Sequence, residues 1–185
     1  RLILVNLNKT LLVDLIYLNT ILPEIIENSE ILEKKEDIYK LGDEKLIAIR
    51  DPLGIRPLVL GSLGSAKIIS SDTCALDIIG AKFEREILNG EIVVIDDNGV
   101  KSYKPFKSQS VRPCIFEYIY FARPDSVLGG RSVYQCRKEL GKFLAKESSH
   151  TGDIIIPVPD SGVPAALGYS EEANIPFDLG IIRNH

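Results

Sequence analysis

The stretch from residue 153 to residue 168 constrains the fold of this chain more than any other. It reads Asp-Ile-Ile-Ile-Pro-Val-Pro-Asp-Ser-Gly-Val-Pro-Ala-Ala-Leu-Gly. The short β-branched run at 154–158, closed by prolines that cannot donate to a sheet, predicts a fully buried strand. The Asp-Ser-Gly sequence predicts a turn, and Pro164 suits a first helical position. Such a strand, loop and helix N-terminus would favour an anion at the loop, although an ordinary strand-to-helix connection explains the same residues equally well.

A parallel sheet is predicted around this stretch. Upstream, Ser132 and Gln135 have the spacing of a capping box, which begins a helix. The predicted apolar face of that helix comprises Val133, Cys136, Leu140, Phe143 and Leu144. A second helix follows the loop and ends at Asn174, and the apolar run at 177–182 predicts the next strand. Strand, helix and strand within about thirty residues form the βαβ unit of a parallel sheet.

The first half of the chain predicts a different kind of sheet, an antiparallel meander. The expected strands are 45–50, 56–61, 67–70, 83–87, 91–95 and 100–103, with a short helix at 73–79. The Asp-Asn-Gly sequence at 97–99 predicts a hairpin turn. Arg50 and Asp51 are expected to fix the hairpin between the first two of these strands and to have no catalytic role. Residues 1–5 predict a further strand, and residues 11–22 predict a helix.

The composition of the chain argues against several classes of protein, and the positions of its prolines indicate a boundary between two parts. The polar, proline-bracketed stretch 105–113 predicts a linker between two parts. A net charge of −4 without a dense basic stripe argues against nucleic-acid binding. No apolar run approaches membrane-spanning length, and three widely spaced cysteines favour a reducing compartment, so we expect a cytoplasmic protein. Because the chain begins at Arg1, contains no methionine and ends at His185 after a strand-like run, we expect a fragment.

Four blocks of the sequence, in order, resemble the glutamine amidophosphoribosyltransferases. They are Arg-Asp-Pro-Leu-Gly-Ile-Arg-Pro-Leu-Val-Leu-Gly at 50–61, Ser-Asp-Thr-Cys-Ala-Leu at 71–76, and the stretches 114–126 and 156–162. The resemblance runs from residue 45 to His185 and is loose before that. It implies the first committed step of purine synthesis. In that step glutamine nitrogen is transferred to phosphoribosyl pyrophosphate, which gives phosphoribosylamine, glutamate and pyrophosphate.

The resemblance also implies a fold class, a mixed α+β and α/β chain. Residues 1–106 would be the C-terminal part of an N-terminal-nucleophile glutaminase sheet domain. Residues 107–113 would be a linker, and residues 114–185 the start of a parallel-sheet type I phosphoribosyltransferase domain. The full-length enzyme is expected to be a homo-oligomer, to use Mg²⁺, and to have purine nucleotides as inhibitors.

The glutaminase half is expected to be inactive. The family begins this domain with a nucleophilic cysteine, and none lies near Arg1. Residues 3–8 resemble the family's His-Asn-Gly-Asn segment, whose asparagine side chain and glycine N–H form an oxyanion hole. On that alignment Asn6 is a remnant of the hole, while Leu7 replaces the glycine and removes its backbone freedom. We therefore assign no catalytic residue.

The predicted substrate-binding residues match the family's pyrophosphate loop. Asp160, Ser161 and Gly162 lie at the loop itself, and Arg183 lies at the family's basic position near the nucleotide phosphate. Small residues with exposed N–H groups suit diphosphate oxygens, and a guanidinium suits phosphate. Asp160 is expected to act through Mg²⁺ or its waters, or to shape the turn. A solvated strand end is the alternative explanation for Arg183.

Cys114 matches the first ligand of a structural four-iron four-sulfur (4Fe-4S) cluster that one branch of the family carries. The other three ligands are expected beyond His185. Cys74 and Cys136 are assigned to core packing. Two functions therefore stay open. One is an incomplete or inactive portion of the transferase, and the other is a non-catalytic phosphate- or nucleotide-binding or regulatory fragment.

Overall fold

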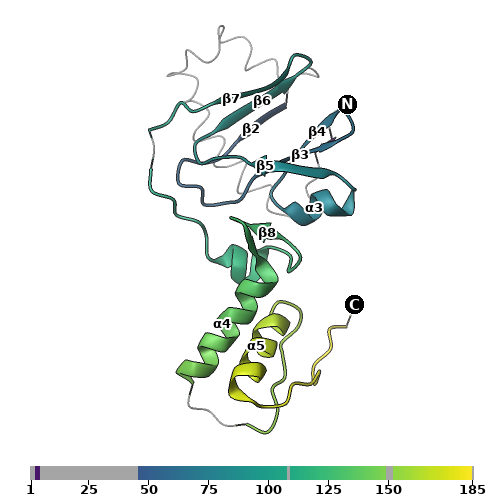
Figure 1. Cartoon of the computed structure of the whole chain (residues 1–185), viewed down its shortest axis with the longest axis vertical. Coiled ribbons are helices and arrows are strands. Elements are labelled where there is room, and N and C mark those ends of the chain that lie inside the picture. Colours follow the sequence, from purple (N-terminus) through teal and green to yellow (C-terminus); the bar gives the residue numbers. More distant parts are fainter. Residues whose placement is uncertain (1–2, 5–45, 108, 149–151, 185) are drawn as a thin grey trace. The chain divides into compact units, whose positions relative to one another are not determined.

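The computed structural model describes residues 3–4, 46–107, 109–148 and 152–184 (Figure 1). The chain divides into two compact units, Arg1–Cys114 and Ile115–His185. The division follows the stretch that the sequence predicted as a linker. Helices and strands occur in both parts, so the mixed α and β character of the prediction is confirmed. The helix expected at 11–22 lies outside the described residues.

Two sheets, not one meander, make up the described part of the first unit. The first sheet has the spatial order β1 (Ile3–Leu4), β4 (Ala66–Ser70), β3 (Val59–Leu63) and β5 (Lys82–Glu86). The second has the order β2 (Leu46–Ile49), β6 (Ile92–Asp96) and β7 (Gly99–Tyr103). All neighbours are antiparallel except β1 and β4, which run parallel. The prediction of antiparallel strands is confirmed over 46–103. The prediction of a meander is wrong, because the strands divide between two sheets.

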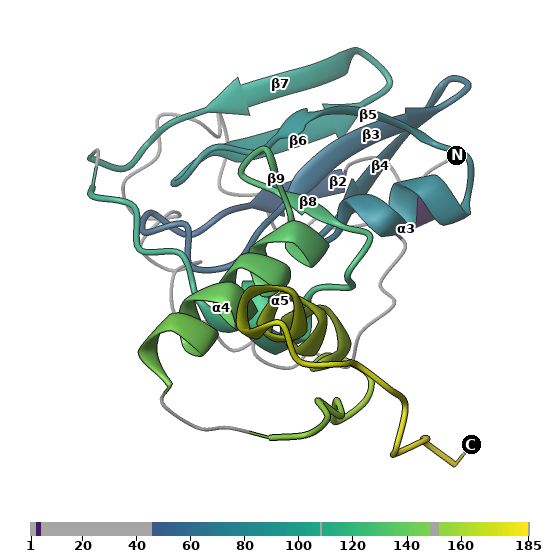
Figure 2. The ribbon, with the colours of Figure 1, turned by 60° about the horizontal axis from the view of Figure 1, so that its bottom comes forward.

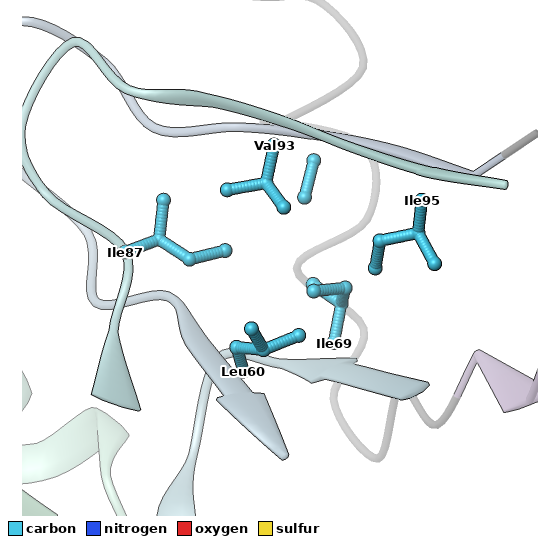
Figure 3. Close-up of a cluster of buried hydrophobic side chains, with 6 residues drawn as sticks. Leu60, Ile69, Ile87, Val93 and Ile95 are labelled. Carbon is cyan, nitrogen blue, oxygen red and sulfur yellow. The ribbon is translucent and has the colours of Figure 1, made fainter. Parts of the chain in front are cut away.

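The two-sheet arrangement follows from strands that are apolar on both faces. Neighbouring residues of a strand point to opposite faces, so Val59 and Leu60 in β3 belong to different cores. Figure 3 shows the core that lies between the sheets. Its buried members are Ala48, Leu60, Ile69, Ile87, Val93 and Ile95. On the other face of the first sheet, α3 (Thr73–Ile78) covers Val59 and Ile68 with Leu76. A single meander would leave one of these faces in water.

The turn after β2 is fixed by its two charged residues, as predicted, but it does not close a hairpin, because β2 and β3 lie in different sheets. The carboxylate of Asp51 accepts hydrogen bonds from the N–H groups of Leu53 and Ile55 at 3.0 Å and 2.9 Å. The Arg50 guanidinium donates to the carbonyls of Arg56 and Ile87 at 3.0 Å and 2.6 Å. These bonds replace the ladder that the backbone loses at the turn.

The stretch predicted as a linker is held to this turn at its far end. The N–H of Arg112 donates to the carbonyl of Leu53 at 2.8 Å, and that of Cys114 to the carbonyl of Ile55 at 2.9 Å. The last residues of the stretch therefore belong to the first unit.

The second unit begins with a tight helical turn and a small hairpin. The π-helical turn η1 (Glu117–Phe121) precedes the two-residue strands β8 (Val127–Leu128) and β9 (Arg131–Ser132). Helix α4 (Val133–Glu147) follows, and the Ser132 hydroxyl accepts from the N–H of Gln135 at 3.4 Å. The predicted helix start is thus confirmed.

The face of helix α4 that packs against α5 differs from the apolar face that the sequence pattern predicted. Figures 1 and 2 show α4 and α5 (Val163–Ala173) side by side. The buried residues of α4 are Val133, Arg137 and Gly141. The predicted apolar residues Leu140, Phe143 and Leu144 are exposed. Close helix approach favours a glycine over a large apolar residue at the contact, which explains the difference.

The predicted βαβ unit is only partly present: its two strands are reduced to a single bridge. Ile155 and Phe177 form one parallel bridge, with hydrogen bonds at 2.8 Å and 3.0 Å. The runs at 154–158 and 177–182 are therefore parallel neighbours, as predicted. They are not extended strands, and the prediction of a fully buried strand is wrong, since Val158 is 71% exposed. A parallel sheet buries its strands only when helices cover both faces and further strands lie alongside. The described residues supply the pair α4 and α5 and this single bridge.

Candidate functional site

The loop after residue 158 folds back on itself. The N–H of Gly162 donates to the carbonyl of Val158 over 3.2 Å, and the N–H of Val163 to that of Asp160 over 3.3 Å. The peptide bond between Pro159 and Asp160 is cis. A Cβ added at Gly162 would lie 2.5 Å from the carbonyl oxygen of Val158, so only glycine fits this turn without a shift of backbone.

Helix α5 begins directly after this loop and leaves backbone donors open. Its N-cap residue, Gly162, has no side chain that could accept a hydrogen bond. Pro164 lies at the second helical position, one later than predicted, because Val163 already has helical geometry. No described residue accepts a hydrogen bond from the N–H of Ser161 or Ala165. The helix start therefore combines two open donors with the positive end of the helix dipole.

Arg183 lies against the same loop. Its Nη1 atom is 3.1 Å from Oδ2 of Asp160. The parallel bridge between Ile155 and Phe177 explains the contact, because parallel neighbours end on the same side of a sheet. The two side chains are 63% and 67% exposed. All four residues predicted for phosphate binding thus lie in one place, since Ser161 and Gly162 follow Asp160 directly.

This arrangement suits an anion that carries several oxygens. A guanidinium, two N–H groups and a helix N-terminus supply positive potential, and such groups bind diphosphate oxygens. Asp160 is the one acid among the four residues. A single carboxylate fits Mg²⁺ when water and the phosphates of a ligand supply the remaining oxygens. The residues present therefore fit Mg²⁺ together with a diphosphate, with Asp160 as the protein's ligand.

The residue predicted as a cluster ligand belongs to the other unit of the chain. Cys114 is half-buried, forms no disulfide and lies in the first unit. Over the described ranges, no three His, Cys, Asp or Glu side chains lie close enough together to hold a metal ion. A 4Fe-4S cluster needs four thiolates, which this part of the chain does not bring together. Asn6 and Leu7 lie outside the described residues.

Three buried charged residues, Glu91, Glu117 and Arg137, were missed by the sequence analysis. Glu91 is buried and accepts hydrogen bonds from both Nη atoms of Arg85 at 2.9 Å and 2.8 Å. Arg137 is buried and donates to the carbonyls of Tyr118 and Ala122 at 2.6 Å and 2.8 Å. Burial lowers the pKa of the Arg137 guanidinium. In the sequence, these residues stand beside or within apolar runs. Charged residues at solvated strand ends and on exposed helix faces occur in the same pattern, so the pattern does not indicate burial.

In the described part of the chain, no helix combines the length and the apolar composition that a bilayer crossing needs. A comparison with models of protein families found no match.

Comparison with known proteins gives a consistent relationship. The chain is 59% identical over 146 residues to an amidophosphoribosyltransferase of Rhizobium etli. It is 47% identical over 162 residues to a chloroplastic amidophosphoribosyltransferase of Glycine max. These matches cover 76% and 87% of this chain, and 29% and 28% of the relatives. The chain thus spans less than a third of the length of the curated relatives that it matches.

A solved structure gives the same relationship in three dimensions. The glutamine phosphoribosylpyrophosphate amidotransferase of B. subtilis, complexed with ADP and GMP, matches with a TM-score of 0.78 and 38% identity. The match covers 89% of this chain and 39% of that chain. Over the segment that it spans, this chain therefore belongs to the amidophosphoribosyltransferase family.

Proposed function

We propose that this chain is part of an amidophosphoribosyltransferase of purine synthesis. The parent enzyme would transfer glutamine-derived ammonia to phosphoribosyl pyrophosphate and release 5-phosphoribosylamine, glutamate and pyrophosphate. The observation that carries the proposal is the loop at the start of α5. Its open donors and the nearby Arg183 lie in a chain that is 59% identical to an enzyme of that name over 146 residues.

We assign the parts of the reaction to the two units. Residues 1–106 would belong to the glutaminase domain, residues 107–113 to a linker, and residues 114–185 to the phosphoribosyltransferase domain. The support is the two-sheet architecture of the first unit and, in the second, the parallel bridge between Ile155 and Phe177 followed by the loop and α5. The glutaminase half is expected to be inactive, because Leu7 aligns with the glycine of the oxyanion hole.

The loop would act on the leaving group of the transfer. The reaction breaks the bond between C1 of the ribose and the pyrophosphate oxygen, and ammonia nitrogen forms the new bond to C1. The electron pair of the broken bond leaves with pyrophosphate, so negative charge grows on its oxygens. Donors and cations that are already in position stabilise that charge. The open N–H groups of Ser161 and Ala165 and the Arg183 guanidinium would supply them, while Gly162 keeps the loop in its turn, and bound Mg²⁺ would neutralise further charge when present.

Further properties of the parent enzyme come with the family. The B. subtilis relative was solved with ADP and GMP, and we extend nucleotide binding, with purine nucleotides as inhibitors, to the parent of this chain. We also propose a cytoplasmic homo-oligomer. Cys114 would be the first ligand of a 4Fe-4S cluster whose other ligands lie elsewhere in the parent.

The second candidate is a non-catalytic module that binds phosphate or a nucleotide. The open N–H groups of Ser161 and Ala165 and the Arg183 guanidinium would bind an anion without performing chemistry, which is what this candidate requires. Both functions use the same anion site, so binding tests the site and turnover separates the functions.

The site is tested by titration of the ¹⁵N-labelled chain with phosphoribosyl pyrophosphate or pyrophosphate in the presence of Mg²⁺. We expect amide chemical-shift changes at Ser161, Gly162 and Arg183. An added Cβ at Gly162 would lie 2.5 Å from the carbonyl oxygen of Val158 and would displace the loop, so Gly162→Ala should abolish the changes. Gly152→Ala is the matched control, because an added Cβ there meets its nearest atom only at 3.8 Å. A folded chain without changes at millimolar ligand, or with changes confined to residues 46–104, would refute the site.

A further inference from the structure

Asp160 and Arg183 form an ion pair within the proposed anion site when no anion is bound. Asp160 Oδ2 and Arg183 Nη1 lie 3.1 Å apart, on segments separated by 23 residues in the sequence. Among the described residues, neither side chain has another ionic or hydrogen-bonding partner. The strongest cation of the site is therefore already neutralised by the acid of the same loop.

An anion that enters this site meets a pair and not a free guanidinium. Arginine has five N–H donors, which match the oxygens of a carboxylate or a phosphate in the same geometry. A diphosphate and the Asp160 carboxylate would therefore seek the same donors. Both side chains of the pair are more than 60% exposed, so the ion pair is weak. A diphosphate can therefore replace the Asp160 carboxylate as the partner of Arg183.

We propose that Asp160 is an internal competitor of the anion: it holds Arg183 at the mouth of the loop in the empty site and is displaced when a diphosphate binds. The inference rests on the proposed function, since it assumes that the loop binds such an anion. Asp160 thereby keeps Arg183 close to its working position and lowers the affinity of the site for weakly charged anions. An anion with several negative charges overcomes the competition.

Simple repulsion between Asp160 and the anion is the rival explanation, and the two differ in their dependence on Arg183. Under competition, the loss of the Asp160 charge increases anion affinity by releasing the guanidinium. The increase therefore vanishes when Arg183 is absent. Under repulsion, the increase persists without Arg183. A double-mutant cycle separates these cases.

The experiment titrates the ¹⁵N-labelled chain with inorganic pyrophosphate in buffer free of divalent metal. The variants are Asp160→Asn, Arg183→Gln and the combination of both. Glu147→Gln is the control, because it removes the same charge at the end of α4, where the side chain is exposed and has no ion pair within the described ranges. Amide shifts elsewhere in the chain report whether each variant keeps its fold.

We expect Asp160→Asn to tighten pyrophosphate binding two- to fivefold, the range that exposed ion pairs span. Arg183→Gln should weaken binding, and Asp160→Asn should have no further effect in the Arg183→Gln background. Equal tightening in both backgrounds, or none in either, overturns the competitor and leaves the site intact. Absence of pyrophosphate binding in all variants refutes the proposed site together with the competitor.

Discussion

At the scale of single residues, the most consequential charge in the first unit is Glu91. Its carboxylate accepts from the Arg85 guanidinium, from the N–H of Leu88 at 2.6 Å, and from the hydroxyl of Ser102. Burial raises the pKa of Glu91. The hydrogen bonds from Arg85, Ser102 and Leu88, with the positive charge of Arg85, outweigh burial and hold the pKa below its ordinary value. The acid is thus stabilised in its charged form.

This network predicts a defined pH dependence of stability. Because the pKa of Glu91 is lower in the folded chain than in the unfolded one, its contribution is complete above pH 4.5. The contribution is lost as the pH falls through the folded-state pKa. Glu91→Gln should lower the free energy of unfolding at neutral pH by about 1–3 kcal/mol, since it leaves donors without a charged acceptor. Urea unfolding at pH 7 and at pH 4 measures both effects.

The control for Glu91 is the same substitution on strand β5. Glu84 pairs with Lys67, and that hydrogen bond, opposed by burial, lowers its pKa as well. The Glu84 pair is partly exposed, so Glu84→Gln should cost less than about 1 kcal/mol. Equal losses for the two variants would contradict the role assigned to burial of Glu91.

At the scale of elements, the second unit depends on two glycines at the crossing of α4 and α5. A Cβ at Gly141 would lie 1.8 Å from the carbonyl oxygen of Ala165. A Cβ at Gly168 would lie 1.9 Å from that of Lys138. Each helix thus approaches the backbone of the other, and a methyl group would force the helices apart. The ion pair of Lys138 with Glu171 joins the same two helices.

We therefore expect Gly141→Ala and Gly168→Ala each to destabilise the second unit by about 1–3 kcal/mol, the cost of overpacking. This outcome opposes helix propensity, which favours alanine over glycine by about 1 kcal/mol. Thermal unfolding followed by circular dichroism measures the loss, with Gly152→Ala as the control. A rise in melting temperature for either helix variant would show that α4 and α5 are not packed this closely.

The helices and the strands of the first unit could be predicted from local sequence patterns. The elements against which they pack could not be predicted in this way. Ser132 and Asn174 marked helix ends through capping chemistry, which needs no tertiary context. The run at 154–158 carried an equally clear pattern, but its burial depends on elements that cover it. Likewise, Leu140 and Phe143 form an apolar stripe, whereas Gly141 makes the contact with α5. Periodicity identifies an apolar face without identifying its neighbour.

At the scale of the whole molecule, the two units differ in how completely they bury their apolar residues. The first unit has a core between its sheets and another beneath α3. The second unit exposes many large apolar side chains. They are Ile115, Phe116, Ile119, Tyr120, Phe121, Val127, Leu140, Phe143, Leu144, Ile154, Ile156, Val158, Leu179, Ile181 and Ile182. The second unit therefore covers fewer of its large apolar side chains with its own elements than the first unit does.

The candidate site could be located from sequence because its residues cluster along the chain. Asp160, Ser161 and Gly162 are consecutive, and the expected strand order brought Arg183 to the same side. The pairing of Asp160 with Arg183 could not be predicted, since both side chains were expected to face a ligand. The 3.1 Å distance between Asp160 Oδ2 and Arg183 Nη1 depends on the tertiary structure, and the positions of the two residues in the sequence do not determine it.

The central proposal is that this chain is a segment of an amidophosphoribosyltransferase. The most direct test replaces the matched 146-residue segment of the Rhizobium etli relative with that of this chain. Pyrophosphate release from phosphoribosyl pyrophosphate is then measured with ammonia as the nitrogen donor. We predict a rate within about tenfold of the unaltered relative, a difference of 1.4 kcal/mol in transition-state stabilisation. A folded chimera that neither binds phosphoribosyl pyrophosphate nor releases pyrophosphate would contradict the claim.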